Sequence, residues 1–400
     1  MLLEYRIEKK LSELEANGQL PLAIELWNGR RFAPTGRPSV TLRVPRTAAL
    51  RRLINPDLAA LGEAYVEGEV DVEGPIDEAF RAAEKLVRNL GSPLKRRLPR
   101  LSPHSKQRDQ EAIRYHYDVS NDFYRLWLDR RMAYSCAYFK TGEEDIDTAQ
   151  EQKLDHICRK LRLRPGERFL DIGCGWGALI IHAAEKYGVD ATGITISENQ
   201  HAVAEKRIRA ARLEDRCRAL LRDYRDLEGE GVFEKIASVG MFEHVGLKNL
   251  PAYFGAIRRL LTDGGIAMNH GITSVDPDGR EVGLGVGEFV ERYVFPHGEL
   301  PHVSLVLKEM SAAKLEVMDV ETLRLHYAKT LARWSRRLEA NLAAARAHAG
   351  EKRTRIWRLY LAGCAHAFER NWVTIHQILA AKSSDPERNP LPWTRDYMYR

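Results

Sequence analysis

The sequence lacks the features that would make it a membrane-spanning or exported protein. No apolar run approaches the roughly 20 consecutive residues that a membrane helix needs. The N-terminus, MLLEYRIEKKLSEL, carries charges throughout and has no apolar core like that of a secretory signal. We therefore expect a cytoplasmic protein.

Cysteine is scarce and scattered. The chain has five cysteines, which form no C-x-x-C pair: Cys136, Cys158, Cys174, Cys217 and Cys364. An odd, dispersed set argues against a disulfide framework and against a zinc site. We therefore expect no structural metal.

What the chain does have is length, apolar content and positive charge. Its 400 residues are 44% hydrophobic, which is enough for two domains with proper cores. The net charge of +6 favours a polyanionic partner. Nucleic acid and an anionic membrane surface both qualify, and composition does not choose between them.

The first 90 residues predict a small α+β domain. Apolar side chains recur with helical spacing over residues 2–16, SVTLRV (39–44) alternates like a strand, and helical periodicity returns over 76–90. Residues 91–110 follow, rich in proline and in Lys and Arg, which indicates a linker. This linker is either a solvated connection or a phospholipid contact, where each basic residue would contribute about 1 kcal/mol.

After residue 150, strand and helix patterns alternate. This rhythm predicts an α/β fold with a mostly parallel, doubly wound sheet, whose ligands bind at the C-terminal strand ends. Two long amphipathic helices are expected near the C-terminus, over 322–347 and 354–382. The candidate strands are 168–172, 189–195, 217–222, 233–240 and 264–270, and helical stretches such as 198–212 and 248–261 separate them.

The segment FLDIGCGWG (169–177) is the most informative part of the chain. An apolar strand ends at Asp171, and glycine then falls at 173, 175 and 177, which permits a tight turn and close approach of a ligand to the backbone. The G-x-G-x-G spacing differs from the G-x-G-x-x-G of a dinucleotide site. It favours a nucleoside without a pyrophosphate, such as S-adenosylmethionine, over an ordinary strand-to-helix turn.

Three further segments carry unusual side chains. Residues 114–139 are crowded with aromatics, VGMFEHVG (239–246) places Glu243 and His244 after a buried strand, and ERYVFPHGELP (291–301) has the composition of a lid or channel wall. Core packing explains much of the aromatic segment. A Glu-His pair that ends an apolar strand is costly for packing alone, so Glu243 is a candidate functional carboxylate.

Together these motifs resemble the cyclopropane-fatty-acyl-phospholipid synthases and their mycolic-acid relatives. The resemblance is carried by YHYDVSNDFYRLWLD, YSCAYF, LDIGCGWG, GITIS, VGMFEHVG, RYVFPHGELP and AFERNW. It implies a Rossmann-like, class I S-adenosylmethionine-dependent methyltransferase domain over 111–400, behind an N-terminal lipid-associating domain over 1–90. It also implies methylene transfer to the cis double bond of unsaturated acyl chains in membrane phospholipids, at the inner leaflet, and a homodimer.

The residues make chemical sense in that role. An isolated alkene is a poor nucleophile, so it must be held against the methyl donor, and the resulting cation needs stabilisation and a positioned base. In the family that base is a bound bicarbonate. The resemblance assigns its holders to the backbone near Cys136, the Glu243 carboxylate, His270, the Ile272 backbone and Tyr327.

The resemblance likewise implies the cofactor contacts. Gly173 and Gly175 would admit the methionine end of S-adenosylmethionine beside Asp171, and Tyr134 and Ser135 would close over it. The remaining expected contacts are Thr195, Ser197 and Gln200 for the ribose, and Asp223 with Tyr224 for the adenine.

Two features are less regular. Many family members have His-Thr-Ile-Gly where this chain has residues 270–273, His-Gly-Ile-Thr, so the chain departs from the family pattern in the loop that bears on substrate choice and ring closure. Cys364 lies on an apolar helical stripe where a buried thiol is ordinarily inert. The family's C-terminal cysteine has been taken as an active-site residue, so Cys364 stays a candidate, although attack of the alkene needs no thiolate.

Two alternative functions stay open. A relative could methylate the same olefin without ring closure and yield a methyl or methylene branch. A nucleic-acid-binding protein with a degenerate cofactor fold would also fit the charge, but no nucleic-acid motif is present, so we expect no nucleic-acid partner.

Overall fold

The computed structural model describes residues 2–47, 49, 52, 56–89, 120–278, 283–296, 298–383 and 392–399. The predicted basic linker (91–110), with its predicted phospholipid contact, lies outside these residues. So does the start of the aromatic segment.

The N-terminal part folds around its own four-stranded sheet, in the order β2-β1-β3-β4. The amphipathic face predicted for α1 packs Ile7, Leu11 and Leu14 into the core of this part. The helix over 2–16 and the strand within 39–44 are confirmed. The elements are α1 (Leu2–Ala16), β1 (Ala23–Leu26), β2 (Arg31–Phe32), β3 (Thr41–Val44), α2 (Leu58–Val66), β4 (Asp71–Glu73) and α3 (Ile76–Asn89).

The larger part is built on a seven-stranded sheet in the order β10-β11-β9-β8-β5-β6-β7. The strands from β9 to β7 pair in parallel, and β11 and β10 are added antiparallel, so the predicted mostly parallel, doubly wound sheet is confirmed. The strands are β5 (Arg168–Ile172), β6 (Asp190–Thr195), β7 (Cys217–Leu221), β8 (Phe233–Val239), β9 (Leu261–Ser274), β10 (Glu316–Thr322) and β11 (Val373–Ala381).

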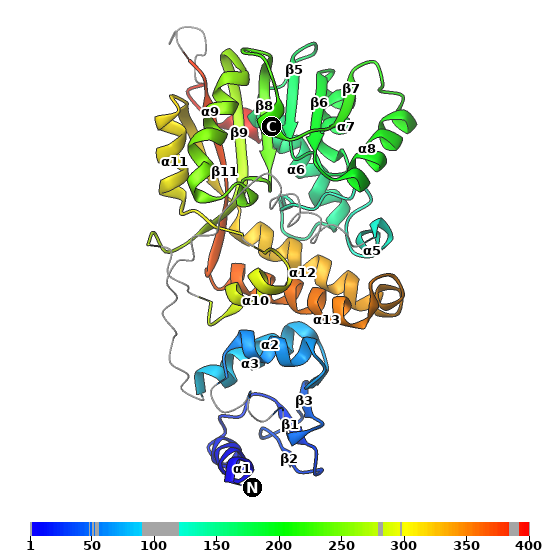
Figure 1. The fold of residues 1–400 in the computed structure, drawn as a ribbon, viewed down its shortest axis with the longest axis vertical. Helices are drawn as coiled ribbons and strands as arrows, with labels where there is room; N and C mark the ends of the chain where they lie inside the picture. The colour runs from blue at the N-terminus through cyan, green and yellow to red at the C-terminus, as the bar shows by residue number, and fades with distance from the viewer. Residues whose placement is uncertain are drawn as a thin grey trace.

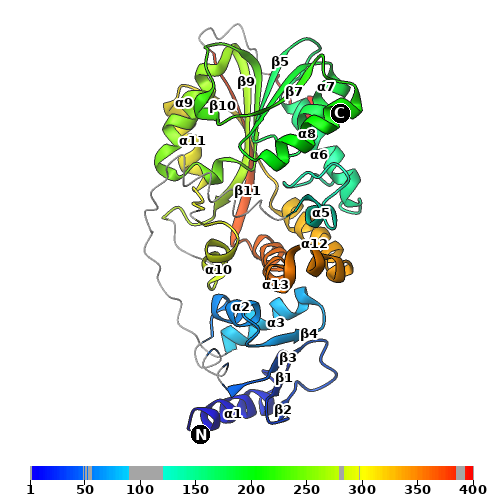
Figure 2. The same ribbon diagram turned by 45° about the vertical axis from the view of Figure 1, so that its right-hand side comes forward.

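Helices cover both faces of this sheet and its C-terminal edge. In Figures 1 and 2, α9 and α11 lie on one face and α6, α7 and α8 on the other, while α12 and α13 cross between the sheet and the N-terminal part. The helices are α5 (Asn121–Arg125), α6 (Ile146–Lys160), α7 (Ala178–Tyr187), α8 (Glu198–Ala211), α9 (Leu250–Leu260), α10 (Val286–Tyr293), α11 (Val303–Ala312), α12 (Arg324–Ala340) and α13 (Leu342–Glu369).

One predicted helix is wrong at its end. The stretch 354–382 was expected to be helical throughout, but α13 ends at Glu369 and the chain returns as β11, which lies between β9 and β10. Asn371 adopts a left-handed conformation (φ 57°) that turns the chain, and β-branched residues then predominate in VTIHQ. A short apolar run such as ILAA fits a buried strand as well as a helix, so periodicity alone could not separate them. Gly350, with non-helical φ and ψ, breaks α13 where the sequence indicated a separation.

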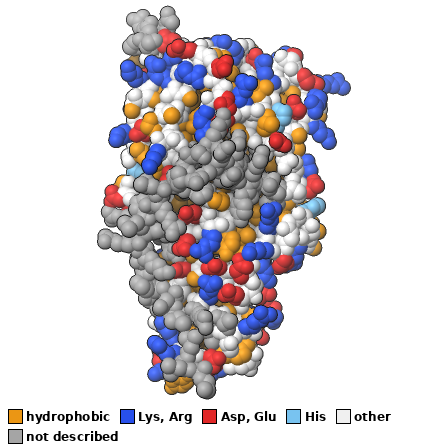
Figure 3. All heavy atoms as spheres, in the orientation of Figure 1, with side chains coloured by type: hydrophobic (Ala, Val, Ile, Leu, Met, Phe, Trp, Pro, Cys, Tyr) orange, Lys and Arg blue, Asp and Glu red, His pale blue; other side chains and the backbone are white. Residues whose placement is uncertain are grey.

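The two parts meet through α2 and α3 on one side and α10 and α13 on the other. Ala362, Ala367 and Trp372, from the end of α13 and the residues after it, belong to the same apolar cluster as the N-terminal core. On the face in Figure 3, Lys and Arg side chains are interspersed with Asp and Glu. Among the described residues, no helix has the length and apolar character of a membrane span.

Candidate active site

The glycine turn opens a cavity at the C-terminal end of β5. Gly173, Gly175 and Gly177 all have positive φ, at 86°, 54° and 81°, a region that side chains rarely adopt. A Cβ at Gly173 would lie 3.1 Å from the Met241 side chain, so the bare backbone keeps the space open. The turn is pinned because the amides of Gly173 and Cys174 both donate to the carbonyl of Ile194 on β6.

This cavity, which we call the cofactor cavity, encloses about 1140 Å³, including space open to solvent. All but one of the predicted cofactor contacts line it: Tyr134, Ser135, Asp171, Gly173, Gly175, Thr195, Gln200, Asp223 and Tyr224. The exception is Ser197, which is not among the lining residues. Its hydroxyl caps α8 by accepting from the Gln200 amide at 3.3 Å, so it positions a lining residue.

Asp171 and Lys153 are two buried ionisable residues that line the cofactor cavity. Asp171 is 2% exposed, one of its carboxylate oxygens has no hydrogen-bond partner, and burial raises its pKa to about 7 against the opposing effect of Lys153. Burial lowers the pKa of Lys153, and nearby Asp129 opposes this. The Lys153 ammonium donates to the Ser135 hydroxyl at 2.9 Å.

Lys153 was missed from the sequence, although a signal exists. It occupies a core position of α6, in register with Ala149 and Ile157, where an apolar residue is expected. A lysine on a buried helical stripe points to a buried carboxylate or anion nearby.

The residues predicted to contact the ribose and the adenine are held by hydrogen bonds to other side chains of the protein. The Thr195 hydroxyl donates to the Gln200 side-chain oxygen at 2.8 Å. Asp223, predicted for the adenine, has its carboxylate engaged by the Arg225 guanidinium at 2.9 and 2.7 Å. Arg225, which sequence reasoning missed, therefore orients Asp223 at the rim of the cavity.

Glu243 lies beside the cofactor cavity, between the lining residues Met241 and His244. One carboxylate oxygen of Glu243 accepts from the Ile272 backbone amide at 2.7 Å, and the other has no partner. Burial raises the pKa of Glu243 to about 7, and the Ile272 hydrogen bond opposes the shift. The Ile272 amide thus positions Glu243 in this structure.

His270 lies two residues before Ile272 on β9, and one of its ring nitrogens is a second buried group without a hydrogen-bond partner. It is 1% exposed, and burial holds its pKa well below the usual value, so the imidazole is neutral. The Gln377 side-chain nitrogen contacts Nδ1 at 3.3 Å, and because an amide nitrogen only donates, this assigns the ring proton to Nε2. Nε2 has no partner.

A series of backbone contacts links Ile272 to the other predicted residues, Tyr327 and Cys136. Ile272 pairs with Ile375 of β11, whose carbonyl accepts from the Leu323 amide. The Leu323 carbonyl in turn accepts from the Tyr327 amide at 3.0 Å and lies 3.8 Å from the Cys136 sulfur. The predicted residues thus come from β9, the start of α12 and the loop after α5, and these segments are linked through β11.

The departure from the family pattern has a local structural reason. Gly271 replaces a threonine of the common pattern, and a Cβ there would lie 1.9 Å from a ring carbon of Phe242 and 3.1 Å from Glu243. The Phe242 ring thus occupies the space of a side chain at position 271, next to the Glu243 carboxylate. The neighbouring residues His270 and Ile272 keep their positions on β9.

Cys364 does not face the cofactor cavity. It lines a second cavity, between α13 and the N-terminal part, and burial raises the pKa of its thiol to about 12. A thiol with so high a pKa is a poor nucleophile at neutral pH.

Sequence and structure comparisons agree on one family. The family model for mycolic acid cyclopropane synthetase matches residues 104–378, and a domain of unknown function, DUF7884, matches residues 11–91. The probable fatty acid methyltransferase of Pseudomonas putida is 51% identical over 95% of this chain and 97% of its own. The cyclopropane-fatty-acyl-phospholipid synthase of Escherichia coli K12 is 34% identical over 90% of this chain and 93% of its own.

Among solved structures, the mycolic acid cyclopropane synthase CmaA1 in complex with SAH and CTAB is 35% identical, with a TM-score of 0.65. The match covers 70% of this chain and 99% of CmaA1. The glycine turn, its cavity and these comparisons together establish the fold as that of a class I S-adenosylmethionine-dependent methyltransferase. The chain belongs to the mycolic acid cyclopropane synthetase family.

Proposed function

We propose that this protein transfers a methylene group from S-adenosylmethionine to the cis double bond of unsaturated acyl chains in membrane phospholipids and closes a cyclopropane ring. A bicarbonate ion beside Glu243 would take the proton that leaves. The observation that carries this proposal is the pair of buried, unpartnered groups on Glu243 and His270 next to the cofactor cavity.

The cofactor cavity fits S-adenosylmethionine. The space kept open at Gly173 would take its methionine end, and the unpartnered oxygen of Asp171 is an acceptor for an ammonium or hydroxyl group. When bound there, S-adenosylmethionine would supply an electrophilic methyl group. The residues lining the cavity orient that donor and exclude water from it.

The groups beside the cavity suit a bicarbonate ion in their hydrogen-bonding pattern. His270 Nε2–H is a donor without an acceptor, and the free oxygen of Glu243 is an acceptor without a donor. Bicarbonate, which carries both anionic oxygens and one hydroxyl, would satisfy both, and it would supply a base for the proton on the transferred methyl. Two anionic groups side by side are costly unless a proton lies between them, and the raised pKa of Glu243 favours such sharing.

The surrounding walls suit an alkene and a transient cation on the acyl chain. Tyr134 is packed by aromatic rings on several sides, including Trp127, Trp334 and Trp357 within 6.2 Å. Such π-faces stabilise positive charge without offering a nucleophile that would trap it. The Tyr327 hydroxyl, whose pKa burial holds well above its usual value, stays protonated and serves as a donor.

The enzyme would meet its phospholipid substrate at the anionic inner leaflet, and the N-terminal part and the linker would contact that membrane surface. The relative from Escherichia coli is named a phospholipid synthase, which supports this substrate class. We retain a homodimer as a further proposal.

The direct test is transfer of labelled methyl from S-adenosylmethionine to vesicles of phosphatidylglycerol. We expect label in lipid with cis-unsaturated chains, none with saturated chains, and a rate that falls when bicarbonate is removed and recovers when it is restored. Label transfer that ignores the double bond would contradict the proposed substrate. A rate indifferent to bicarbonate would contradict the proposed base.

A second candidate is an acyl-chain methyltransferase that yields a methyl or methylene branch. The relative from Pseudomonas putida at 51% identity, named a probable fatty acid methyltransferase, favours it. Gly271, with Phe242 packed against it beside Glu243, is the feature of this chain that could change where the proton is lost.

A further inference from the structure

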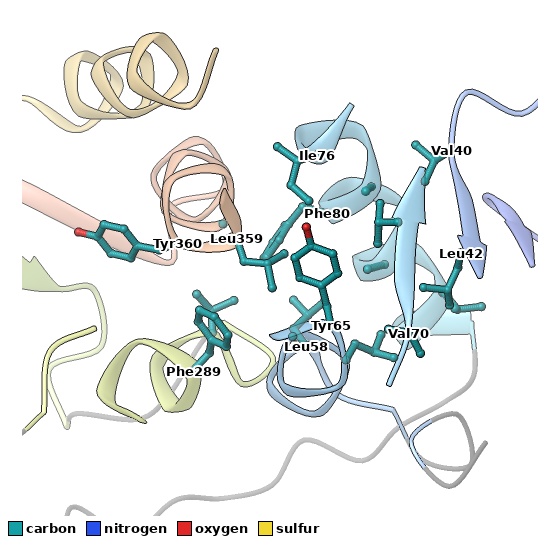
Figure 4. A pocket seen from close by; sticks show the side chains of 18 of the residues that line it. Val40, Leu42, Leu58, Tyr65, Val70, Ile76, Phe80, Phe289, Leu359 and Tyr360 are labelled. Atoms are coloured by element: carbon teal, nitrogen blue, oxygen red, sulfur yellow. The ribbon is translucent and has the colours of Figure 1, made fainter. Parts of the chain in front are cut away.

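The cavity between the N-terminal part and the catalytic part, here called the interdomain cavity, has no role in the chemistry above. Its volume is about 840 Å³, including space open to solvent. Figure 4 shows its walls: Phe289 and Leu359 from the catalytic part face Tyr65, Phe80 and Ile76 from the N-terminal part. Apolar side chains from both parts line this space, and a lining of that kind is typical of a site for an apolar ligand.

Ion pairs join the two parts close to the interdomain cavity, so their relative position is fixed there. Arg292 of α10 pairs with Glu63 of α2 at 3.0 Å, and Lys352 of α13 pairs with Glu67 at 2.8 Å. The buried Glu84 of α3, next to the lining residue Ala83, also bonds to His366 of α13 at 2.7 Å. The cavity itself is lined by apolar side chains, as in sites that take an apolar ligand.

The interdomain cavity and the cofactor cavity meet at a pair of tyrosines. Tyr134 lines the cofactor cavity, Tyr360 lines the interdomain cavity, and their hydroxyls are 3.2 Å apart. On the same helix as Tyr360, Cys364 also lines the interdomain cavity, and it packs against the apolar cluster that contains Tyr327. The apolar cluster that contains Tyr327 therefore borders both cavities, through Trp176 on one side and Phe289 on the other.

We propose that the interdomain cavity takes the methyl-terminal end of the acyl chain, and that its depth sets how many carbons the enzyme accepts beyond the double bond. This inference rests on the proposed function. An apolar interior excludes the head group, so the methyl end is the part of a phospholipid that fits. For the acyl chain to enter, side chains between the two cavities, above all that of Tyr360, change their conformation.

The N-terminal part then acts in substrate selection. About half of the cavity wall comes from β3, α2, β4 and α3, within or bordering the residues matched by DUF7884. The solved relative CmaA1 is matched over 99% of its length yet covers only 70% of this chain. A tail pocket of this form therefore belongs to chains that carry both parts.

The test varies the methyl end alone. Phosphatidylglycerols would carry a cis double bond at a fixed distance from the carbonyl and methyl ends that lengthen by two methylenes at each step. Ala83→Leu fills the cavity from α3 and Phe80→Ala enlarges it. Lys85→Leu, on the exposed side of the same helix, is the matched control.

Each methylene of the acyl chain that is buried raises the affinity about fourfold. Leucine is longer than alanine by three carbons, so Ala83→Leu should displace two or three methylenes of the acyl chain from the cavity. We expect Ala83→Leu to lower kcat/KM for the longest methyl end by about tenfold or more relative to the shortest. Phe80→Ala should shift the preference toward longer ends, and Lys85→Leu should not shift it. Binding of S-adenosylhomocysteine should be unchanged in all three variants.

Equal loss of activity on every chain length, or an unchanged preference in Phe80→Ala, would overturn the tail pocket. If Ala83→Leu fails to fold, Phe80→Ala alone decides the question. If the cavity served only the packing of the two parts, enlarging it would not shift the preference toward acyl chains with longer methyl ends. If the wild-type protein binds S-adenosylhomocysteine but labels no unsaturated lipid, the proposed function fails and this inference falls with it.

Discussion

Glu243→Gln should lower activity and, at alkaline pH, raise stability. Glutamine has nearly the same shape and its oxygen can still accept from the Ile272 amide, but it cannot share a proton with an anion. General acid–base groups contribute roughly 10² to 10⁴ in rate, so we expect kcat to fall by about 100-fold or more. The measurement is label transfer to unsaturated phosphatidylglycerol with bicarbonate in excess.

The stability change follows from the raised pKa of Glu243. Its pKa moves from 4.5 to about 7 on folding, which corresponds to about 3 kcal/mol. Because the folded state binds the proton more tightly, this stability is fully present below pH 4.5 and is lost as the pH rises through about 7. Above pH 7 the wild-type protein carries a buried charge that the glutamine variant avoids.

We therefore expect Glu243→Gln to be more stable than wild type at pH 8, by up to about 3 kcal/mol, and no more stable at pH 4. Thermal melts across this pH range measure it, with the exposed Glu230→Gln as the control. A variant that turns over within about threefold of wild type would refute the assigned role, since a proton-sharing group is worth far more. A loss of stability at pH 8 would refute the electrostatic reasoning.

Three further substitutions test separate parts of the site. Gly173→Ala should raise the Kd for S-adenosylhomocysteine by about tenfold or more in calorimetry, whereas Gly188→Ala, with similar backbone strain outside the cavity, should cost stability alone. Gly271→Ala should lower unfolding free energy by about 2 kcal/mol because it meets the Phe242 ring, and Phe242→Leu should relieve part of that loss; full stability of the single variant would contradict the packing. Cys364→Ala should keep activity within about threefold, and a folded variant without activity would restore the thiol to the chemistry.

The strands β5 to β9 were predictable because they contain apolar runs that end in polar or glycine residues, whereas β10 was not predicted. The turn after Asp171 was the clearest case, since positive φ at three alternating glycines leaves one plausible local geometry. β11 was not predictable, because its apolar run follows a long helix without a proline or glycine to mark the change. Only pairing with β9 and β10, a non-local effect, selects the strand.

Much of the candidate site followed from motifs, but its internal bonds did not. Lys153 and Gln377 are distant in sequence from the groups they contact, and neither lies in a motif. The interdomain cavity was equally hidden, because its walls come from two parts of the chain whose packing no local pattern specifies.

The most direct test of ring closure uses S-adenosylmethionine with a fully deuterated methyl group. If a base removes one proton from the transferred methyl and the ring closes, the lipid product keeps two of the three deuterons and has lost its double bond. Mass spectrometry with proton NMR of the purified lipid measures both. A product that keeps all three deuterons, or that keeps two with an exocyclic double bond, would contradict the cyclopropane account.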